Sequence, residues 1–182
     1  MPYGWEGPNV RLAPLDKAKH LENARLWMND PEVTAWTLSG DFPMTLLAQE
    51  AWMDERSRAA DPTNISFAVE TLAGEHLGFS GLHQIDYRHG VATTGTMLGR
   101  KDLWGKGYGS EAAALRTRYA FEVLGLRLLQ SGVMAGNTGS LHMLAKAGYK
   151  EVGRVPRRWW KRGAYRDEVM MVLERPEGAR PA

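Results

Sequence analysis

Three glycines alternate with single residues between Trp104 and Ser110, in the order Trp-Gly-Lys-Gly-Tyr-Gly-Ser. Glycine permits positive φ angles and the close approach of a ligand, and the first turn of a helix offers unpaired N–H groups. A helical pattern follows this segment and ends at Gly125, with an expected apolar face of Ala112, Leu115, Tyr119 and Val123. The combination is typical of an anion-binding loop, most often for phosphate, although a plain loop before a helix has the same local pattern.

Two common phosphate motifs do not describe this loop. The chain has no Walker A string, and Gly109 comes one residue too early for the dinucleotide fingerprint Gly-x-Gly-x-x-Gly. That fingerprint also needs an acidic residue at the end of a following strand, whereas Glu122 lies within the expected helix. The spacing therefore indicates a third kind of anion-binding loop.

Hydrophobic periodicity and turn residues predict the elements that position this loop. Strands are expected at 10–14, 65–69, 76–86, 91–99, 128–134, 149–161 and 165–173, and helices at 16–28, 45–59, 112–123 and 137–148. The apolar faces expected for two of these helices are Leu46, Ala48, Trp52 and Met53, and Leu141, Leu144 and Ala145. The segment 31–43 is expected to be an irregular loop, and 65–99 an antiparallel meander.

The order strand, helix, strand around the glycine loop predicts a right-handed crossover between parallel neighbours, 91–99 and 128–134. The expected fold class is therefore α/β (mixed α+β), with a central twisted mixed sheet of about seven strands and about four flanking helices. We expect a single domain over residues 1–182, with a loose tail at 176–182.

Composition narrows the classes of function. The chain has 182 residues, of which 43% are hydrophobic, a formal net charge of +2 and no cysteine. The absence of cysteine excludes disulfides, thiolate nucleophiles and cysteine-ligated metals, and the small net charge gives no reason to expect nucleic acid or membrane as a partner. Residues 1–8 lack the apolar core of a signal peptide, and no apolar run is long enough to span a membrane, so a cytoplasmic location is expected.

A second motif runs from Asn137 to Tyr149 and includes Asn-x-x-Ser and Lys-Ala-Gly-Tyr. Together with the glycine loop and the segment Gly-Ala-Tyr-Arg-Asp at 163–167, it resembles the GNAT superfamily of N-acetyltransferases over nearly the whole chain. The nearer resemblance is to the branch that contains bacterial ribosomal-protein N-terminal acetyltransferases. It implies transfer of an acetyl group from acetyl-CoA to a primary amine by direct attack in a ternary complex, without a metal.

The resemblance also implies where coenzyme A binds. Main-chain amides of the glycine loop would hold its pyrophosphate, the preceding strand would pair with the pantetheine arm, and Asn137 would bind the amides of that arm. Ser140 would lie near the thioester sulfur, and the backbone N–H of Leu98 would stabilise the oxyanion. The implied coenzyme residues are Met97, Leu98, Gly99, Trp104, Gly105, Lys106, Gly107, Tyr108, Gly109, Ser110, Asn137 and Ser140.

The proton-transfer groups of the superfamily do not carry over. The stretch 92–96 has no glutamate, and Leu144 stands where many relatives have a tyrosine. His83 is the candidate base, since its pKa is ordinarily near neutrality, and Ser140 is the candidate proton donor to sulfur. Each residue also has a structural interpretation. His83 is then a partly buried histidine of a strand, and Ser140 is a residue in the first turn of a helix whose side chain satisfies backbone groups.

The acceptor is open between a protein α-amino group and a small amine. Trp36, Phe42 and Trp52 are candidate walls of its pocket, although core packing fits them equally. Residues 154–166 include six basic residues and the pair Trp159-Trp160, a composition that could bind nucleic acid. The favoured interpretation is a hairpin in which the arginines lie in solvent and one tryptophan packs on the core. An acyl-CoA-binding module without transferase activity is a further alternative, and dimers are common among relatives.

Overall fold

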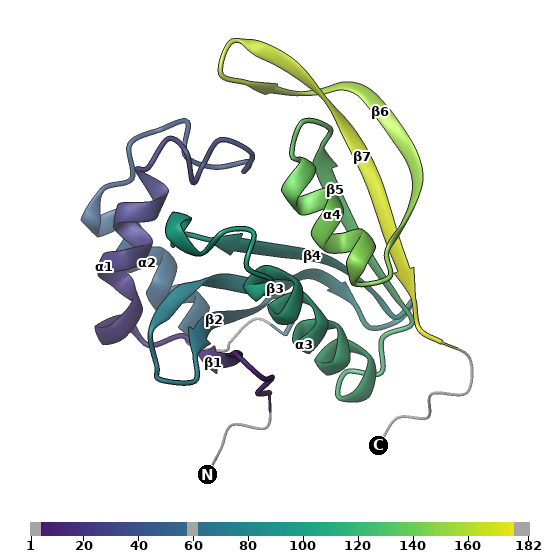
Figure 1. Cartoon of the computed structure of the whole chain (residues 1–182), viewed down its shortest axis with the longest axis horizontal. Helices are drawn as coiled ribbons and strands as arrows, with labels where there is room; N and C mark the ends of the chain where they lie inside the picture. The colour runs from purple at the N-terminus through teal and green to yellow at the C-terminus, as the bar shows by residue number, and fades with distance from the viewer. Residues whose placement is uncertain (1–4, 58–61, 177–182) are drawn as a thin grey trace.

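The computed structural model describes residues 5–57 and 62–176, in which seven strands form one twisted sheet in the order β1-β2-β3-β4-β5-β7-β6 (Figure 1). The strands are β1 (Val10–Pro14), β2 (Ile65–Thr71), β3 (His76–Asp86), β4 (Val91–Leu98), β5 (Leu128–Met134), β6 (Lys150–Lys161) and β7 (Ala164–Glu174). The helices are α1 (Lys17–Met28), α2 (Leu46–Ser57), α3 (Tyr108–Glu122) and α4 (Thr138–Lys146), with a 3-10 turn η1 (Lys101–Leu103). The fold is the expected single mixed α/β domain.

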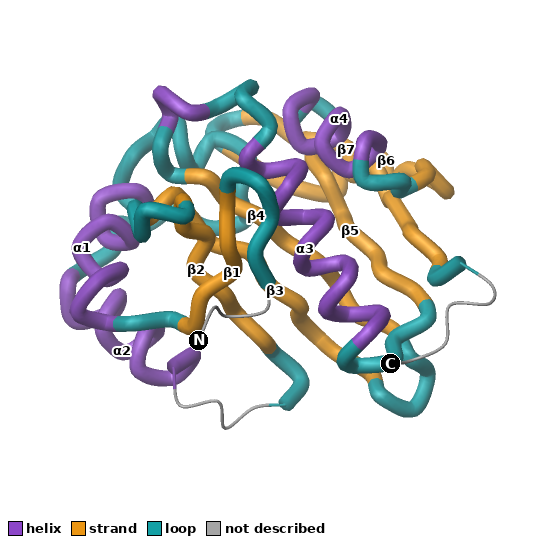
Figure 2. Tube along the Cα trace, turned by 60° about the horizontal axis from the view of Figure 1, so that its bottom comes forward, coloured by secondary structure: helices purple, strands orange, loops and turns teal. Residues whose placement is uncertain are grey.

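Helices lie on both faces of this sheet (Figure 2). On one face α3 buries Ala112 and Leu115 against apolar residues of β1, β2 and β3, and Ala120 and Phe121 join a second apolar cluster with α4. On the other face α1 and α2 cover β3, where the ring of Trp52 meets that of Phe79 edge-on at 5.7 Å. The side chains of α3 and α4 therefore pack on one face of the sheet, and those of α1 and α2 pack on the other.

The parallel neighbours β4 and β5 stay paired over a short distance. Their ladder runs from Val91↔Leu128 to Thr93↔Gln130. Beyond this point β4 continues against β3 as far as Leu98, and β5 continues against β7 as far as Met134. The two strands thus part and leave a V-shaped gap between them, which opens towards the glycine loop (Figure 1).

The expected elements agree with the structure to within a few residues, whereas several expected apolar faces are wrong. Val123 is 56% exposed, because α3 ends at Glu122 and turns away from the sheet. Ala145 on α4 is exposed, as are Leu46 and Ala48 on α2, where Gln49 and Met53 are buried instead. The expected loose tail beyond Pro176 and the last residues of the expected second helix lie outside the described residues.

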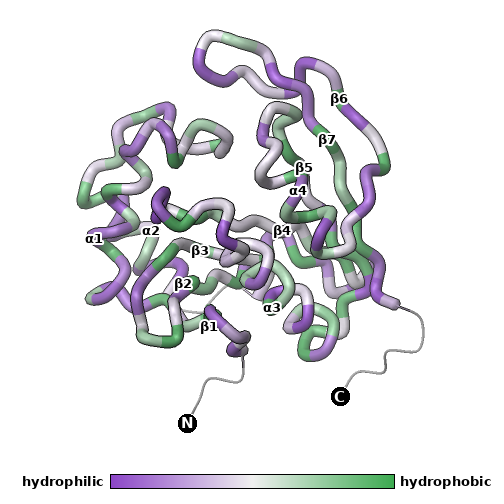
Figure 3. Tube along the Cα trace, viewed as in Figure 1, coloured by the Kyte–Doolittle hydropathy of each residue, from purple (hydrophilic) through white to green (hydrophobic). Residues whose placement is uncertain are grey.

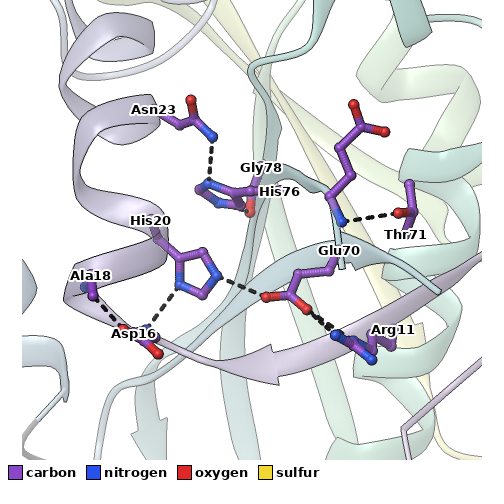
Figure 4. A network of polar contacts seen from close by, with 10 residues as sticks. Arg11, Asp16, Ala18, His20, Asn23, Glu70, Thr71, His76 and Gly78 are labelled. Atoms are coloured by element: carbon purple, nitrogen blue, oxygen red, sulfur yellow. Dashed lines mark hydrogen bonds and ion pairs between the residues drawn. The ribbon is translucent and has the colours of Figure 1, made fainter. Parts of the chain in front are cut away.

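A buried polar network fastens α1 to the sheet (Figure 4). His20 Nδ1 accepts from the Asp16 N–H at 2.9 Å, so its proton lies on Nε2, which donates to Glu70 at 2.9 Å. Glu70 also accepts from Arg11. The ring of His76 lies 4.4 Å from that of His20 and donates from Nε2 to the Gly78 carbonyl at 3.0 Å.

The β6–β7 hairpin projects from the sheet, and its tip is hydrophilic (Figure 3). Its register shifts between Val155 and Trp159, next to Arg157 at φ +51°. Neither tryptophan joins a core cluster, contrary to expectation: Trp159 is half-buried under Arg158, and Trp160 is exposed beside Tyr165. The end of the hairpin reaches beyond the apolar core, so these two tryptophans have no core cluster to enter. In residues 5–57 and 62–176, no helix is long and apolar enough to cross a membrane.

Candidate active site

A cleft of ≈ 1180 Å³ runs through the gap between β4 and β5 and is lined by residues from both faces of the sheet. Its walls divide into two groups. One, the glycine half, consists of the parted end of β4, the glycine loop 104–110 and the start of α4. The other, the aromatic half, consists of residues 28–44 that border the cleft together with Gln49, Trp52, Phe79 and His83.

The glycine loop has the geometry of an anion cradle. Gly105 and Gly107 have φ angles of +76° and +92°, and a Cβ added at either would meet nothing within 4 Å. The first bond of α3 runs from the Glu111 N–H to the Gly107 carbonyl at 3.0 Å, so the N–H groups of residues 108–110 precede the helical ladder. Open space and unpaired main-chain donors therefore meet at the positive end of α3.

The parted end of β4 offers a second set of main-chain groups. Gly99 donates its N–H to Leu77 O at 2.9 Å, and successive residues of a strand point their backbone groups to opposite sides. The N–H of Leu98 therefore points away from β3, into the gap, while the Leu98 carbonyl accepts from Trp104 Nε1 at 2.9 Å. An extended ligand can add to this free strand edge.

Hydroxyl groups close the narrow end of the gap. Ser131 donates to the Thr94 carbonyl at 3.3 Å, and the Thr94 hydroxyl lies 3.3 Å from both the Gln130 carbonyl and the Tyr149 hydroxyl. These bonds bridge the two strands one residue beyond the last backbone pair, Thr93↔Gln130. A ligand that follows β4 inward from the glycine loop must therefore end beside Thr94.

Asn137 and Ser140 both border the cleft at the start of α4. Asn137 caps this helix, because its Oδ1 accepts from the Ser140 N–H at 3.1 Å. Its Nδ2 and the Ser140 hydroxyl make no hydrogen bond to the described residues. The backbone of Ser140, rather than its hydroxyl, is thus the satisfied group, and the hydroxyl is available to a ligand.

His83 borders the cleft on the α2 face of β3. Burial, followed by the charges of Arg56 and Arg116, lowers the pKa of its imidazole. The ring makes no hydrogen bond to the described part of the chain. A neutral imidazole with a free nitrogen can accept a proton. Over the described ranges, no group of three His, Asp or Glu side chains is placed to hold a metal ion.

The aromatic half has apolar walls and few charges. Trp36 and Trp52 border the cleft as expected, together with Phe79, whereas Phe42 is 85% exposed and does not. Among the described lining residues the one carboxylate is Glu32, which forms an ion pair with Lys101. Gln49 is 2% exposed, and its Oε1 is buried without a hydrogen-bond partner among the described residues. It is a polar group in apolar surroundings.

The tip of the β6–β7 hairpin fixes the loop that carries Trp36. Lys161 is 2% exposed, and its Nζ donates to the Ser39 carbonyl at 2.8 Å and pairs with Asp41 at 2.9 Å. Arg166 stacks over the ring of Trp36 with its Cζ 5.4 Å from the centroid. The basic segment of the hairpin thus forms part of the wall around the aromatic half.

Most residues expected at the site lie in one cleft. The residues that border it are His83, Met97, Leu98, Trp104, Gly105, Gly107, Gly109, Ser110, Asn137 and Ser140. Three do not. Gly99 packs against Trp27, whose ring a Cβ would meet at 1.8 Å, and its N–H is used within the sheet. Tyr108 turns its side chain to the apolar cluster of α3, and the Lys106 side chain is exposed, so neither side chain borders the cleft.

Sequence reasoning missed Arg116 and Gln49, which also border the cleft. Arg116 follows Ala112 and precedes Ala120 at four-residue spacing, on the buried face of α3. A charged residue on an apolar helix face was the available signal. Gln49 gave a weaker signal, because the apolar pattern of α2 is irregular.

The sequence of the chain matches a known protein family. The family model described as "Acetyltransferase (GNAT) domain" matches residues 9–150. An uncharacterized N-acetyltransferase p20 of Bacillus licheniformis is 30% identical over 129 residues, which are 70% of this chain and 71% of that protein. An L-methionine sulfoximine/L-methionine sulfone acetyltransferase of Pseudomonas aeruginosa is 26% identical over 149 residues, 80% of this chain and 83% of that protein.

Solved structures share the fold. A spermidine N-acetyltransferase of Vibrio cholerae, crystallised with CoA and spermine, superposes with a TM-score of 0.84 over 92% of this chain and 96% of its own. The two sequences are 19% identical, so the similarity extends to the architecture alone.

Proposed function

Because the chain belongs to the GNAT family of acetyltransferases, we propose that its acceptor is a small primary amine without a second positive charge, bound in the aromatic half of the cleft. The chain is an acetyl-CoA-dependent N-acetyltransferase of the GNAT type. The proposal concerns the identity of the acceptor and the residues that hold the two substrates. It places acetyl-CoA in the glycine half, so that donor and acceptor meet across the parted strands.

The glycine loop is the single observation that carries the coenzyme site. Donors precede the ladder of α3 beside Gly107, whose Cα faces open space. A diphosphate fits this arrangement, since main-chain N–H groups and the helix dipole both favour an anion. We assign the diphosphate to main-chain amides of residues 105–110, the pantetheine arm to the free edge of β4 at Leu98, and the amides of the arm to Asn137 Nδ2.

The chemistry needs a neutral amine, a donor for the oxyanion and a route for the leaving thiolate. His83 is assigned as the base or the end of a water relay, because its lowered pKa keeps the imidazole neutral. The Leu98 N–H is assigned to the oxyanion, since it points into the gap. The Ser140 hydroxyl is assigned as proton donor to sulfur, because it has no partner in the described part of the chain.

The charge of the aromatic half favours one acceptor class over another. A polyamine carries two or more positive charges, and carboxylates in the site favour recognition of such a ligand. Here the one lining carboxylate among the described residues is already paired, while Arg56 lies close enough to lower the pKa of His83. Aromatic walls and the Gln49 amide suit an amine on an apolar body with one further polar group.

Two of the similar proteins have different kinds of acceptor. The Vibrio cholerae structure contains spermine, a polyamine, and the Pseudomonas aeruginosa relative is named for methionine sulfoximine and methionine sulfone. The second kind of acceptor has no second positive charge. Besides its α-carboxylate it carries a polar sulfone or sulfoximine group, to which the Gln49 amide could donate a hydrogen bond. A protein N-terminus, the acceptor suggested by the sequence resemblance, also carries a single positive charge at its amine and belongs in the test.

The test is release of free thiol from acetyl-CoA with a matched panel of acceptors. The panel contains methionine sulfone, phenylethylamine, peptides with a free N-terminus, and spermidine. We expect kcat/KM for the best singly charged amine to exceed that for spermidine about ten-fold or more. Preference for spermidine would reject the acceptor class and leave the enzyme class intact. Tight coenzyme binding without thiol release for any amine would instead support an acyl-CoA-binding module.

A further inference from the structure

Arg116 is the largest fully buried side chain in the described part of the chain, with 0% exposure. No carboxylate of the described residues forms an ion pair with it. Burial lowers the pKa of its guanidinium, and only the neighbouring Tyr149 opposes this effect. A buried arginine normally has a carboxylate partner, because an uncompensated charge is costly to remove from water.

The guanidinium lies on the α3 face of β4, at the narrow end of the gap. Its Nη1 donates to the Gly95 carbonyl at 2.9 Å, to Thr96 Oγ1 at 2.6 Å and to Ser80 Oγ at 3.2 Å. Its Nε and Nη2 are buried and have no hydrogen-bond partner in the structure as described. Arg116, Thr94, Gly95 and Thr96 all border the cleft.

The two hydroxyl partners of Arg116 can be satisfied without its charge. Ser80 Oγ and Thr96 Oγ1 lie 3.1 Å apart and can bond each other, so each retains a partner without the arginine. The residues that flank Arg116 by one helical turn, Ala112 and Ala120, are apolar and fully buried. An apolar side chain of similar volume would satisfy this position, and such replacements of buried charges are often neutral or stabilising.

We propose that Arg116 supplies the positive charge that stabilises the CoA thiolate as it leaves. The inference rests on the proposed function, which places the pantetheine arm along β4. Because hydroxyl bonds close the gap at Thr94, an arm that enters from the glycine loop brings its sulfur to the end of the gap that Arg116 underlies.

The step that the charge assists is the collapse of the acyl adduct. The amine nitrogen forms a bond to the carbonyl carbon and gives up a proton, the carbon–sulfur bond breaks, and its electron pair remains on sulfur. The products are the amide and the thiolate, which then takes a proton to give free CoA. A fixed cation in a site of low polarity stabilises that sulfur anion without touching it.

Other charged groups near this point do not provide the same effect. His83 lies on the opposite face of the sheet and has a lowered pKa, which leaves it uncharged near neutral pH. The hydroxyl of Tyr149 lies 3.3 Å from that of Thr94 and carries no positive group. Lys146 and His142 border the cleft from α4, where both side chains are exposed to solvent.

The experiment measures the thiol pKa of bound CoA in the wild type and in Arg116→Met and Arg116→Lys. Thiolate is followed by its ultraviolet absorbance over a pH series, and desulfo-CoA, which lacks the sulfur, is the matched ligand. We expect Arg116→Met to unfold at the same or a higher denaturant concentration and to bind desulfo-CoA unchanged. The pKa of its bound thiol should rise by about one unit, with a roughly ten-fold lower kcat.

The lysine variant separates charge from shape. Arg116→Lys keeps the cation, so the pKa of the bound thiol should stay near the wild-type value even if kcat falls several-fold. An unchanged thiol pKa in a folded Arg116→Met protein would overturn the inference. If that variant does not fold, the lysine variant decides, and a thiol pKa raised by a full unit there would overturn it as well. Failure of the wild type to bind either ligand would instead reject the proposed coenzyme site.

Discussion

The two halves of the cleft are built from different kinds of atoms. The glycine half presents main-chain groups: the amides that start α3 and the free edge of β4 beyond Thr93. The aromatic half presents side chains from α2, β3 and the loop between α1 and α2, held by the tip of the β6–β7 hairpin. A main-chain site binds what is common to all reactions of a family, while a side-chain site can change with the acceptor.

Gly107→Val is the strongest test of the main-chain half. Its φ of +92° is unfavourable for a β-branched residue, and the added side chain would occupy the open space of the cradle. We expect affinity for CoA to fall about a thousand-fold, since two or more hydrogen bonds to a charged group are lost. Isothermal titration with CoA measures this effect.

Gly125→Val is the matched control for this substitution. Gly125 also has a positive φ, +66°, with nothing within 4 Å of an added Cβ, but it lies at the other end of α3 and outside the cleft. It should show the cost of backbone strain without loss of CoA binding. Equal losses in the two variants would mean that Gly107 acts through stability alone, and the contrast between the halves would fail.

The sequence predicted the main-chain half and left much of the side-chain half open. Glycine spacing and an Asn N-cap are local signals, so the loop at 104–110 and the start of α4 could be predicted residue by residue. The wall around Trp36 depends on Lys161 and Arg166, more than a hundred residues away along the chain. No local pattern specifies such a contact. For the same reason Phe42, in the same loop, was wrongly expected to line the pocket.

His83→Gln tests the proton-transfer role on the aromatic side of β3. Loss of a general base typically lowers kcat about a hundred-fold, and CoA affinity should change less than two-fold because the residue lies outside the glycine half. In the wild type the lowered pKa of His83 keeps the base neutral at pH values at which a free imidazole is already protonated, so the acid limb of the profile of kcat/KM against pH should lie below pH 6.5. The exposed His89→Gln is the control. Full turnover in His83→Gln would remove His83 from the mechanism.

Gln49→Leu tests the role of the buried Gln49 side-chain amide in the aromatic half. The substitution removes a buried oxygen that has no partner among the described residues, so the free energy of unfolding should stay the same or increase. For the best acceptor kcat/KM should fall about ten-fold, the value of one neutral hydrogen bond, with CoA affinity unchanged. A loss confined to stability, with normal acceptor kinetics, would make Gln49 a structural residue only.

The smallest expected effect is a change in stability with pH, caused by His76 beneath the aromatic half. His76 packs its ring at 4.6 Å from Trp27 and 4.9 Å from Phe79, which borders the cleft. Burial, followed by the nearby His20, lowers the pKa of His76 from 6.5 to about 4. The unfolded chain therefore takes up a proton at a higher pH than the folded chain does. This contribution to stability is complete above pH 6.5 and is lost as the pH falls from 6.5 towards about 4.

Between about pH 7 and about pH 5.5 the free energy of unfolding should decrease by about 1 kcal/mol through this histidine. Glu70, whose pKa is lowered by its bonds to His20 and Arg11 against the opposing effect of burial, adds its loss only at more acidic pH. Urea unfolding at the two pH values, for the wild type and His76→Gln, isolates the histidine. Amide hydrogen exchange should show faster opening of α1 and β3 at the lower pH, while the hydrogen-bonded amides of α3 from Glu111 onward stay protected. Equal loosening at both sites would contradict the division of the cleft into independently supported halves, because His76 packs directly against Phe79 of the aromatic half.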